Sequence, residues 1–144
     1  MFRQIDEKTY ASPQIEVGDI AEASALGIGL IVNNRPEDES PDQTPGAAIE
    51  AAAKAAGIAY VAIPVTHAGF SMPQVEAMQA ALAEAGDKPV LAYCRSGTRS
   101  TLLWALAQAR TGMAVDAIAA HAAGAGYDVG PIRPQLDFLA AQAR

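Results

Sequence analysis

The chain is most constrained by a short apolar segment that leads into a polar loop and then into a second apolar segment. Residues 89–93 are Pro-Val-Leu-Ala-Tyr, the loop 94–100 holds the only cysteine, and residues 102–109 are rich in leucine and alanine. This order predicts a buried strand, a tight turn and a helix, the repeating unit of α/β folds. A loop that opens a helix directs several backbone N–H groups to one point, where the helix dipole adds positive field. The segment therefore predicts an anion-binding loop that begins with a cysteine.

The side chains of this loop favour a nucleophilic cysteine. The loop N–H groups that would hold an anion also stabilise a thiolate at Cys94. Gly97 permits a backbone conformation that a side chain would hinder, and Arg99 supplies a planar two-pronged donor. An isolated cysteine is more often a buried apolar residue, but a core cysteine has no need of two arginines, a glycine and three hydroxyl residues in the next six positions. We expect Cys94 and Arg99 to be catalytic and the rest of the loop to bind an anion: Arg95, Ser96, Gly97, Thr98 and Ser100, whose hydroxyl would hydrogen-bond the sulfur or the loop.

The loop resembles the active-site loops of two enzyme classes. Cys94-x-x-Gly97-x-Arg99-Ser100 resembles the signature of cysteine-based protein phosphatases, which is a histidine, the cysteine, five residues, an arginine and then serine or threonine. It departs from that signature because four residues separate Cys94 from Arg99 and because Tyr93 replaces the histidine. A loop of the form Cys-Arg-x-Gly-x-Arg is also similar to that of rhodanese-type sulfurtransferases, whose cysteine carries a persulfide.

Most of the chain resembles a narrower group, the bacterial phosphatase-like domain of unknown function that also occurs in beta-lactamase hydrolase-like proteins. The residues that carry this resemblance are four segments in the family's order: 10–15, 30–36, 60–65 and the Cys94 loop. The resemblance implies a fold like that of the dual-specificity phosphatases. In such phosphatases an aspartate on a separate loop protonates the leaving group, and by chain order that loop should lie within residues 64–72.

Residue patterns agree with an α/β fold of the cysteine-phosphatase type, with a central, mostly parallel sheet flanked by helices and a helical C-terminal third. A chain of 144 residues, of which 51% are hydrophobic, suits a single domain over residues 1–144. The predicted strands are 2–5, 9–11, 29–33, 59–63 and 90–93, and 59–63 is expected to be buried. The predicted helices are 16–26, 47–56, 73–85, 98–110, 115–123 and 133–143, and 35–46 is expected to be a long surface loop.

Two residues outside the Cys94 loop are accessory candidates. The segment 64–72 contains no carboxylate, and its only group that titrates near neutrality is His67, which would act as acid or base or donate to an anion. Arg35 follows a buried strand at the edge where ligands of α/β sheets bind. It would either hold an anion or pair with Glu37 or Glu39 and anchor the long loop. The acidic cluster 37–39 is expected to be solvated.

The composition restricts the kinds of ligand and partner that this protein is expected to bind. One cysteine and two histidines without close ligand spacing predict no metal and no cofactor, and the formal net charge of −6 argues against general nucleic-acid binding. The apolar runs are too interrupted to span a bilayer, and residues 1–6 lack the features of a signal peptide. We expect a cytoplasmic protein that binds a small anionic substrate, with a thiol protein as a further acceptor.

Three functions remain. We favour sulfur transfer, in which Cys94 takes a sulfane sulfur from a donor and passes it to a thiol or cyanide, because a terminal sulfur is smaller than a phosphoryl group and suits a short loop. The alternative is a hydrolase of the protein-tyrosine or dual-specificity phosphatase type, which acts on phosphate monoesters through a phosphocysteine. The second alternative is an anion or redox sensor in which Cys94 is reversibly oxidised without turnover.

Overall fold

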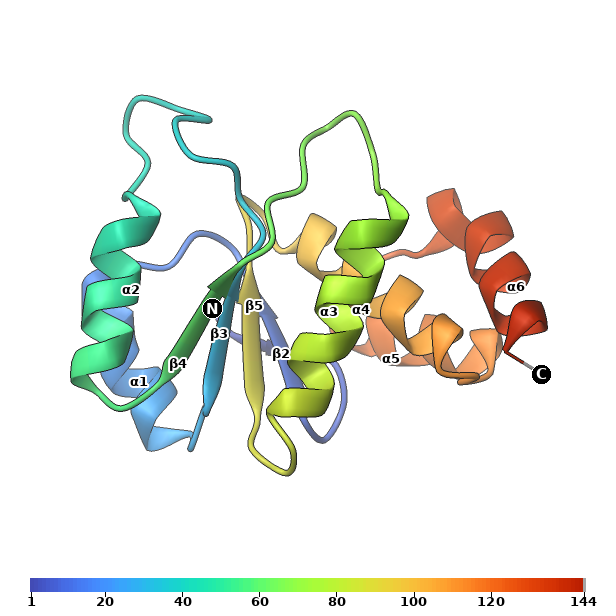
Figure 1. Ribbon diagram of the computed structural model, residues 1–144, viewed down its shortest axis with the longest axis horizontal. Coiled ribbons are helices and arrows are strands. Elements are labelled where there is room, and N and C mark those ends of the chain that lie inside the picture. Colours follow the sequence, from blue (N-terminus) through green and yellow to red (C-terminus); the bar gives the residue numbers. More distant parts are fainter. Residues whose placement is uncertain (144) are drawn as a thin grey trace.

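The computed structural model describes residues 1–143 and contains a five-stranded sheet (Figure 1). The strands are β1 (Arg3–Gln4), β2 (Thr9–Ser12), β3 (Leu30–Asn33), β4 (Ala59–Ala62) and β5 (Val90–Tyr93), in the spatial order β1-β2-β5-β3-β4. β1 is antiparallel to β2, and every other neighbouring pair is parallel. The predicted mostly parallel sheet is confirmed, and β5, the strand that leads to Cys94, lies in its centre.

Helices cover both faces of this sheet. The helices are α1 (Ile20–Ala25), α2 (Gly46–Ala55), α3 (Met72–Glu84), α4 (Thr98–Arg110), α5 (Val115–Gly124) and α6 (Arg133–Gln142), with short 3-10 helices η1 (Val17–Asp19) and η2 (Gly130–Ile132). Figure 1 shows α1 and α2 on one face and α3 and α4 on the other. The chain runs from β2 through α1 to β3 and through α2 to β4, which is one direction across the sheet, and then returns through α3 to β5. Because such crossovers are right-handed, connections that run in opposite directions place their helices on opposite faces of the sheet.

The side chains of β5 alternate between two apolar clusters. Val90 and Ala92 join the larger cluster with residues of α3 to α6, whereas Leu91 and Tyr93 join the smaller cluster with residues of α1 and α2. Helix α4 is covered by α3, α5 and α6, and its Trp104 is fully buried. The Cys94 loop therefore connects the central strand to the central helix, so both of its ends are fixed by the core.

Two sequence-based expectations about these elements need correction. Residues 59–63 were expected to form a buried strand, but β4 lies at the edge of the sheet and none of its residues is fully buried. The expected helix 16–26 is divided into η1 and α1. The Asp19 carboxylate accepts the backbone N–H of Glu16 at 2.7 Å, and this cap closes a tight first turn before α1 begins. Helix α4 has the predicted bounds.

None of the helices within residues 1–143 combines the length and the apolar character needed to cross a lipid bilayer.

Candidate active site

Cys94 lies at the carboxyl end of β5, the edge at which ligands of parallel sheets bind. Its side chain is fully buried, and the N–H of Gly97 points at the Cys94 Sγ with an N–S distance of 3.1 Å. Gly97 has a φ of +93° and stands directly before α4, so the first turn of the helix faces the sulfur. The loop has the geometry of an anion cradle with a thiol at its base.

Arg99 lies on the first turn of α4, and acceptors from two other segments hold its guanidinium. Nη1 donates to Oε2 of Glu39 at 2.8 Å and to the Val65 carbonyl oxygen at 2.6 Å, while Nη2 donates to Oε1 of Glu39 at 2.8 Å. The hydrogen bond to Glu39 is the main reason that the pKa of Arg99 is raised, and a thiolate on Cys94 raises this pKa further, against the effect of burial. The sulfur and the guanidinium are therefore neighbours.

Sequence analysis considered Glu39 only as an alternative to Glu37 in a pair with Arg35, and its contact with Arg99 was not predicted. Its side chain is only 13% exposed, and besides Arg99 it pairs with the Nε of Arg35 at 3.0 Å. The hydrogen bond from Arg99, together with Arg35, lowers the pKa of Glu39 to about 2, although burial alone would raise it. The expectation that the cluster 37–39 is solvated is wrong for Glu39, because two arginines converge on its carboxylate. No local sequence signal connects Glu39 to Arg99.

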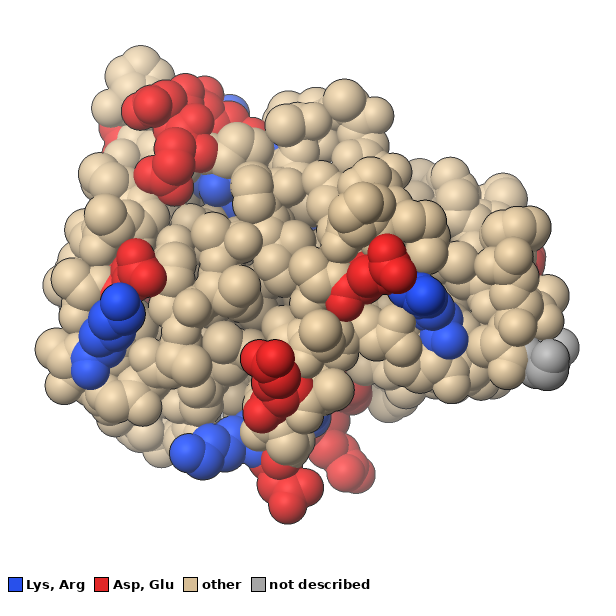
Figure 2. Space-filling view, in the orientation of Figure 1, with Lys and Arg blue, Asp and Glu red and all other residues tan. Residues whose placement is uncertain are grey.

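The other acidic residues of the loop between β3 and α2, which are Glu37, Asp38 and Asp42, are exposed. Figure 2 shows acidic atoms gathered over this loop, with basic atoms visible beneath them. The carboxylate of Glu37 accepts the backbone N–H of Gly46 at 2.9 Å, so it caps the first turn of α2.

Arg35 anchors this loop. Its Nε donates to Glu39, its Nη1 donates to Oε1 of Gln14 at 3.0 Å, and its Nη2 donates to Oγ of Ser40 at 3.0 Å. All three nitrogens of the buried guanidinium have acceptors within the protein. Of the two roles weighed for Arg35, the structure favours the pairing with Glu39 over direct anion binding.

Ser100 differs from its expected role. Its buried hydroxyl donates to Oδ1 of Asn34 at 2.8 Å rather than to the sulfur or the loop. Asn34 also donates from Nδ2 to the Ile63 carbonyl at 2.9 Å and from its backbone N–H to the Tyr93 carbonyl at 2.8 Å. One buried asparagine thus joins the ends of β3, β4 and β5 to the first turn of α4.

The exposed residues of the loop are Arg95, Ser96 and Thr98. The Ser96 hydroxyl donates to Oγ1 of Thr98 at 3.1 Å and accepts the Thr98 backbone N–H at 3.3 Å. These two hydroxyls therefore bond within the loop, whereas Arg95 extends from its surface. All five predicted anion-binding residues lie within residues 95–100, directly after Cys94. The Ser100 hydroxyl, however, bonds to Asn34.

Tyr127 is a second residue that sequence analysis did not select. Its hydroxyl donates to the Ser96 carbonyl oxygen at 3.2 Å, and the carbon of Arg3 that carries the guanidinium nitrogens lies 5.3 Å from its ring centroid. Tyr127 follows α5, outside the local pattern of the Cys94 loop, so only the tertiary fold brings it there. It holds the outer part of the loop in place.

His67 lies at the mouth of the site on the segment between β4 and α3. Its side chain is 77% exposed, and its Nε2 is 3.8 Å from Oε2 of Glu39. The segment carries no carboxylate, as the sequence shows. The structure brings a carboxylate, that of Glu39, to the same place from the loop after β3, so His67 and Glu39 lie together at the edge of the site.

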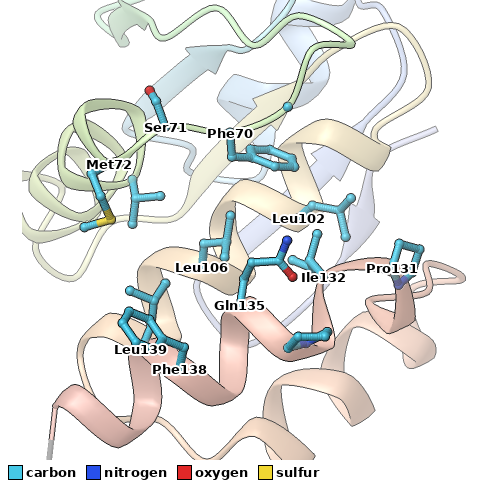
Figure 3. A pocket seen from close by; sticks show the side chains of 13 residues that line it. Phe70, Ser71, Met72, Leu102, Leu106, Pro131, Ile132, Gln135, Phe138 and Leu139 are labelled. Atoms are coloured by element: carbon cyan, nitrogen blue, oxygen red, sulfur yellow. The ribbon is translucent and has the colours of Figure 1, made fainter.

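A mostly apolar groove of about 650 Å³ begins on the other side of the His67 segment (Figure 3). Phe70 and Leu102 line it from this segment and from α4, and the exposed Met72 and Phe138 lie along its walls. The segment therefore has two faces, because Val65 and His67 meet the Arg99 site while Phe70 meets the groove.

Comparison with known proteins agrees with this geometry. A sequence model of the family described as beta-lactamase hydrolase-like protein, phosphatase-like domain, matches residues 1–111. The beta-lactamase hydrolase-like protein of Xylella fastidiosa strain 9a5c is 34% identical over 139 residues, which are 96% of this chain and 32% of that protein. The chain thus spans about a third of the length of this curated relative.

Solved structures place the fold among the phosphatases. The structure of a candidate phosphatase from Neisseria meningitidis is 37% identical, with a TM-score of 0.80, and the match covers 99% of this chain and 97% of that one. PTPMT1, solved in complex with PI(5)P, is 13% identical with a TM-score of 0.74 over 99% of each chain, a likeness of fold alone. These matches support the phosphatase alternative better than the sulfur transfer that we favoured from loop length. The chain belongs to the phosphatase-like domain family of beta-lactamase hydrolase-like proteins, and its fold is related to that of the protein tyrosine phosphatases.

Proposed function

We propose that this protein is a cysteine-dependent hydrolase of phosphate monoesters in which Cys94 is the nucleophile. The observation that carries this proposal is the approach of the Gly97 N–H to the Cys94 sulfur at 3.1 Å, at the start of the helix that bears Arg99. An N–H that faces the sulfur also faces an oxygen of a group bonded to that sulfur. The cradle then stabilises the negative charge of a transferred phosphoryl group.

The first step transfers the phosphoryl group to sulfur. The Cys94 thiolate donates an electron pair to phosphorus, an S–P bond forms, and the P–O bond to the alcohol breaks with its electrons on oxygen. Arg99 and the loop N–H groups bind the phosphoryl oxygens. His67 is the group proposed to protonate the departing oxygen, because it lies at the mouth of the site on the segment between β4 and α3 and its Nε2 is 3.8 Å from Oε2 of Glu39.

The second step returns the enzyme to its starting state. Water attacks phosphorus, the S–P bond breaks with its electrons on Cys94, and inorganic phosphate is released. His67, neutral after the first step, is placed to accept the proton of that water. The proposed substrate is a small anionic ester. This choice is supported by PTPMT1, a protein of similar fold that was solved in complex with PI(5)P.

Sulfur transfer is the second candidate, and the length of the loop favours it. Four residues separate Cys94 from Arg99, one fewer than in the phosphatase signature that the loop resembles. In this reaction the thiolate attacks the outer sulfur of thiosulfate, the S–S bond breaks, sulfite leaves, and Cys94 keeps one sulfur as a persulfide. A thiolate or cyanide then removes that sulfur.

The proposed functional unit is the whole chain as one domain. The family model ends at residue 111, but α6 packs on α4 and Tyr127 bonds to the Cys94 loop. These contacts support the inclusion of the C-terminal third in the active unit.

The deciding experiment compares turnover and covalent labelling in the purified chain. We expect hydrolysis of p-nitrophenyl phosphate that falls by about three orders of magnitude in Cys94→Ser and by about two in Arg99→Lys, because the nucleophile and the charge-stabilising fork are removed. Arg110→Lys is the matched control. It changes an arginine on the same helix that pairs with Glu76 on the surface at 3.2 Å, and it should leave turnover unchanged.

Intact mass separates the two candidates. The reduced protein is exposed to thiosulfate, with Cys94→Ser alongside. Gain of one sulfur atom by the parent alone, with no Cys94-dependent phosphate release from the aryl ester, would replace the hydrolase proposal with sulfur transfer. Phosphate release without any gain of sulfur supports the hydrolase.

A further inference from the structure

A stripe of side chains on α4 leads from the Cys94 loop to the apolar groove. Residues four apart lie on the same face of a helix, so Thr98, Leu102 and Leu106 form one stripe along α4. Thr98 is exposed in the anion cradle, whereas Leu102 and Leu106 line the groove. A rise of about 1.5 Å per residue places Leu102 about 6 Å along the helix axis from Thr98. The groove therefore begins about one helical turn from the cradle.

Two other segments also extend from the cradle to the groove. In the segment between β4 and α3, the Val65 carbonyl binds Arg99 and Phe70 lines the groove. In the segment after α5, the Tyr127 hydroxyl bonds to the loop that forms the cradle, and Pro131 lines the groove. The cradle and the groove are thus bounded by the same three parts of the chain, so one ligand could contact both.

The groove differs from the cradle in its chemistry. Of the described residues that line it, none is charged, and only Ser71 and Gln135 have polar side chains. Figure 3 shows the Gln135 amide among the apolar side chains of the groove. Met72 and Phe138 are large apolar residues of its walls that remain exposed. Apolar surface in contact with water favours a ligand that is itself apolar.

We propose that the substrate is a phosphate monoester of a linear apolar chain, whose phosphate binds in the cradle and whose chain lies in the groove. This inference rests on the proposed function and names the class of ester on which it acts. One molecule of this class matches two neighbouring surfaces of different chemistry, an anion site that contains Arg99 and an uncharged groove. The P–O bond that breaks is the bond to the chain, so the first product is an apolar alcohol.

The size of the groove favours a small ligand over a second copy of this chain. A stable interface between two proteins takes about 20–30 residues of each partner. The described residues that line the groove number 13, and its volume of about 650 Å³ is typical of sites for small molecules. Continuity with the cradle then favours a ligand that also carries an anionic group.

Binding of two alkylphosphonates to the full chain, measured by calorimetry, tests the inference without requiring turnover. Ethylphosphonate and octylphosphonate carry the same anionic group, and neither contains an ester bond that hydrolysis could break. We expect the Kd of octylphosphonate to be roughly 30-fold to 100-fold lower, because the longer chain buries methylene groups in the groove. Octylphosphonate is used below the concentration at which it forms micelles.

Gln135→Glu places a charge in the groove at an exposed position, with almost no change of shape. We expect it to raise the Kd of octylphosphonate about tenfold, because the chain would lie against a carboxylate, and to change the Kd of ethylphosphonate less than twofold. Gln142→Glu is the matched control. It makes the same change at an exposed position of α6 outside the groove, and both Kd values should stay within twofold of the parent.

Two further variants separate the two ends of the ligand. Phe138→Ala removes part of the groove wall at a side chain that is 63% exposed, so the fold should tolerate it. It should raise the Kd of octylphosphonate about threefold to fivefold. Arg99→Lys should instead raise the Kd of both probes by a similar factor, because it weakens binding of the anionic group that they share. Thermal midpoints of all variants report folding.

Steady-state kinetics connect binding to turnover. The value of kcat/KM for octyl phosphate should exceed that for ethyl phosphate by roughly the ratio of the two Kd values. Gln135→Glu should reduce this preference for the longer chain, and Gln142→Glu should preserve it.

Four outcomes would overturn the inference. The first is an equal Kd for the two probes, and the second is a preference for octylphosphonate that neither Gln135→Glu nor Phe138→Ala reduces, since the chain would then lie elsewhere. The third is a parent that sediments as a dimer and becomes monomeric in Phe138→Ala, which would assign the groove to a second copy. The fourth is a parent that binds neither probe.

The proposed function fails separately from this inference. A parent that binds octylphosphonate in the groove but hydrolyses no phosphate ester would refute the proposed hydrolase while the apolar-chain ligand stands. A parent that hydrolyses p-nitrophenyl phosphate through Cys94 but has equal Kd values for the two probes would retain the hydrolase and refute the apolar chain.

Discussion

The hydroxyl of Tyr127 donates a hydrogen bond to the Ser96 carbonyl oxygen at 3.2 Å, across 31 residues of sequence. Tyr127 lies beyond residue 111, where the match to the family model ends, yet it contacts the loop that carries Cys94. Burial raises the pKa of the Tyr127 phenol, so this hydroxyl keeps its proton and remains a donor at neutral pH. The C-terminal third therefore supports the outer part of the anion cradle.

Tyr127→Phe tests this support. The ring stays in place and one hydrogen bond is lost, so we expect the free energy of unfolding to fall by about 0.5–1.5 kcal/mol and kcat/KM to fall roughly threefold to tenfold. Urea denaturation and steady-state kinetics measure both. Tyr10→Phe removes a hydroxyl from a residue packed on the opposite apolar cluster and serves as control. Equal kinetics in the two variants would contradict a role for the Tyr127 hydroxyl.

Gly97→Ala tests the backbone conformation of the cradle. A Cβ at this position would overlap the Tyr127 hydroxyl oxygen and lie 2.9 Å from Cζ of the ring, at a φ of +93°. We expect turnover to fall by at least about two orders of magnitude, because the Gly97 N–H would leave the sulfur. Addition of Tyr127→Phe should recover part of the lost thermal stability by removing the overlapping oxygen. A double variant less stable than Gly97→Ala would argue against this steric cause.

Ser100→Ala and Asn34→Ala test the buried junction behind the sulfur. Each variant leaves a buried polar partner without its hydrogen bond, so we expect the free energy of unfolding to fall by about 1–3 kcal/mol for Ser100→Ala. The loss should be larger for Asn34→Ala, because this variant also leaves the Ile63 carbonyl without the Asn34 Nδ2 donor. The double variant should lose less than the sum, because both remove the same bond. Strict additivity in urea denaturation would contradict direct coupling.

The Glu39 carboxyl predicts a specific acid dependence of stability. Its pKa is lowered from an ordinary 4.5 to about 2, mainly by the Arg99 hydrogen bond, so its ionised form stabilises the folded state fully above about pH 4.5. This contribution should fall as the pH drops from about 4.5 to about 2. The difference in unfolding free energy between the parent and Glu39→Gln should therefore shrink over that interval. A difference independent of pH would mean that Glu39 is not ionised in the folded protein.

Local sequence determined the elements around Cys94. An apolar strand, a glycine-containing loop and an apolar helix are encoded by neighbouring residues, so β5 and α4 were predicted with the bounds that the structure has. The parallel sheet followed from the alternation of strands and helices. The chain order of strands does not specify their spatial order, so β4 was expected to be buried although it forms an edge.

Only the tertiary structure decided which side chains meet at the site. Arg99 and Glu39 are 60 residues apart, and Ser100 and Asn34 are 66 apart. The sequence offered Glu37 and Glu39 alike as partners of Arg35, and only the contact with Arg99 on α4 distinguishes Glu39 from its exposed neighbours. The residues around Cys94 are its neighbours in the sequence and could be predicted from it. The acceptors that bind Arg99 come from other segments, and their positions depend on how strands and loops converge at one edge of the sheet.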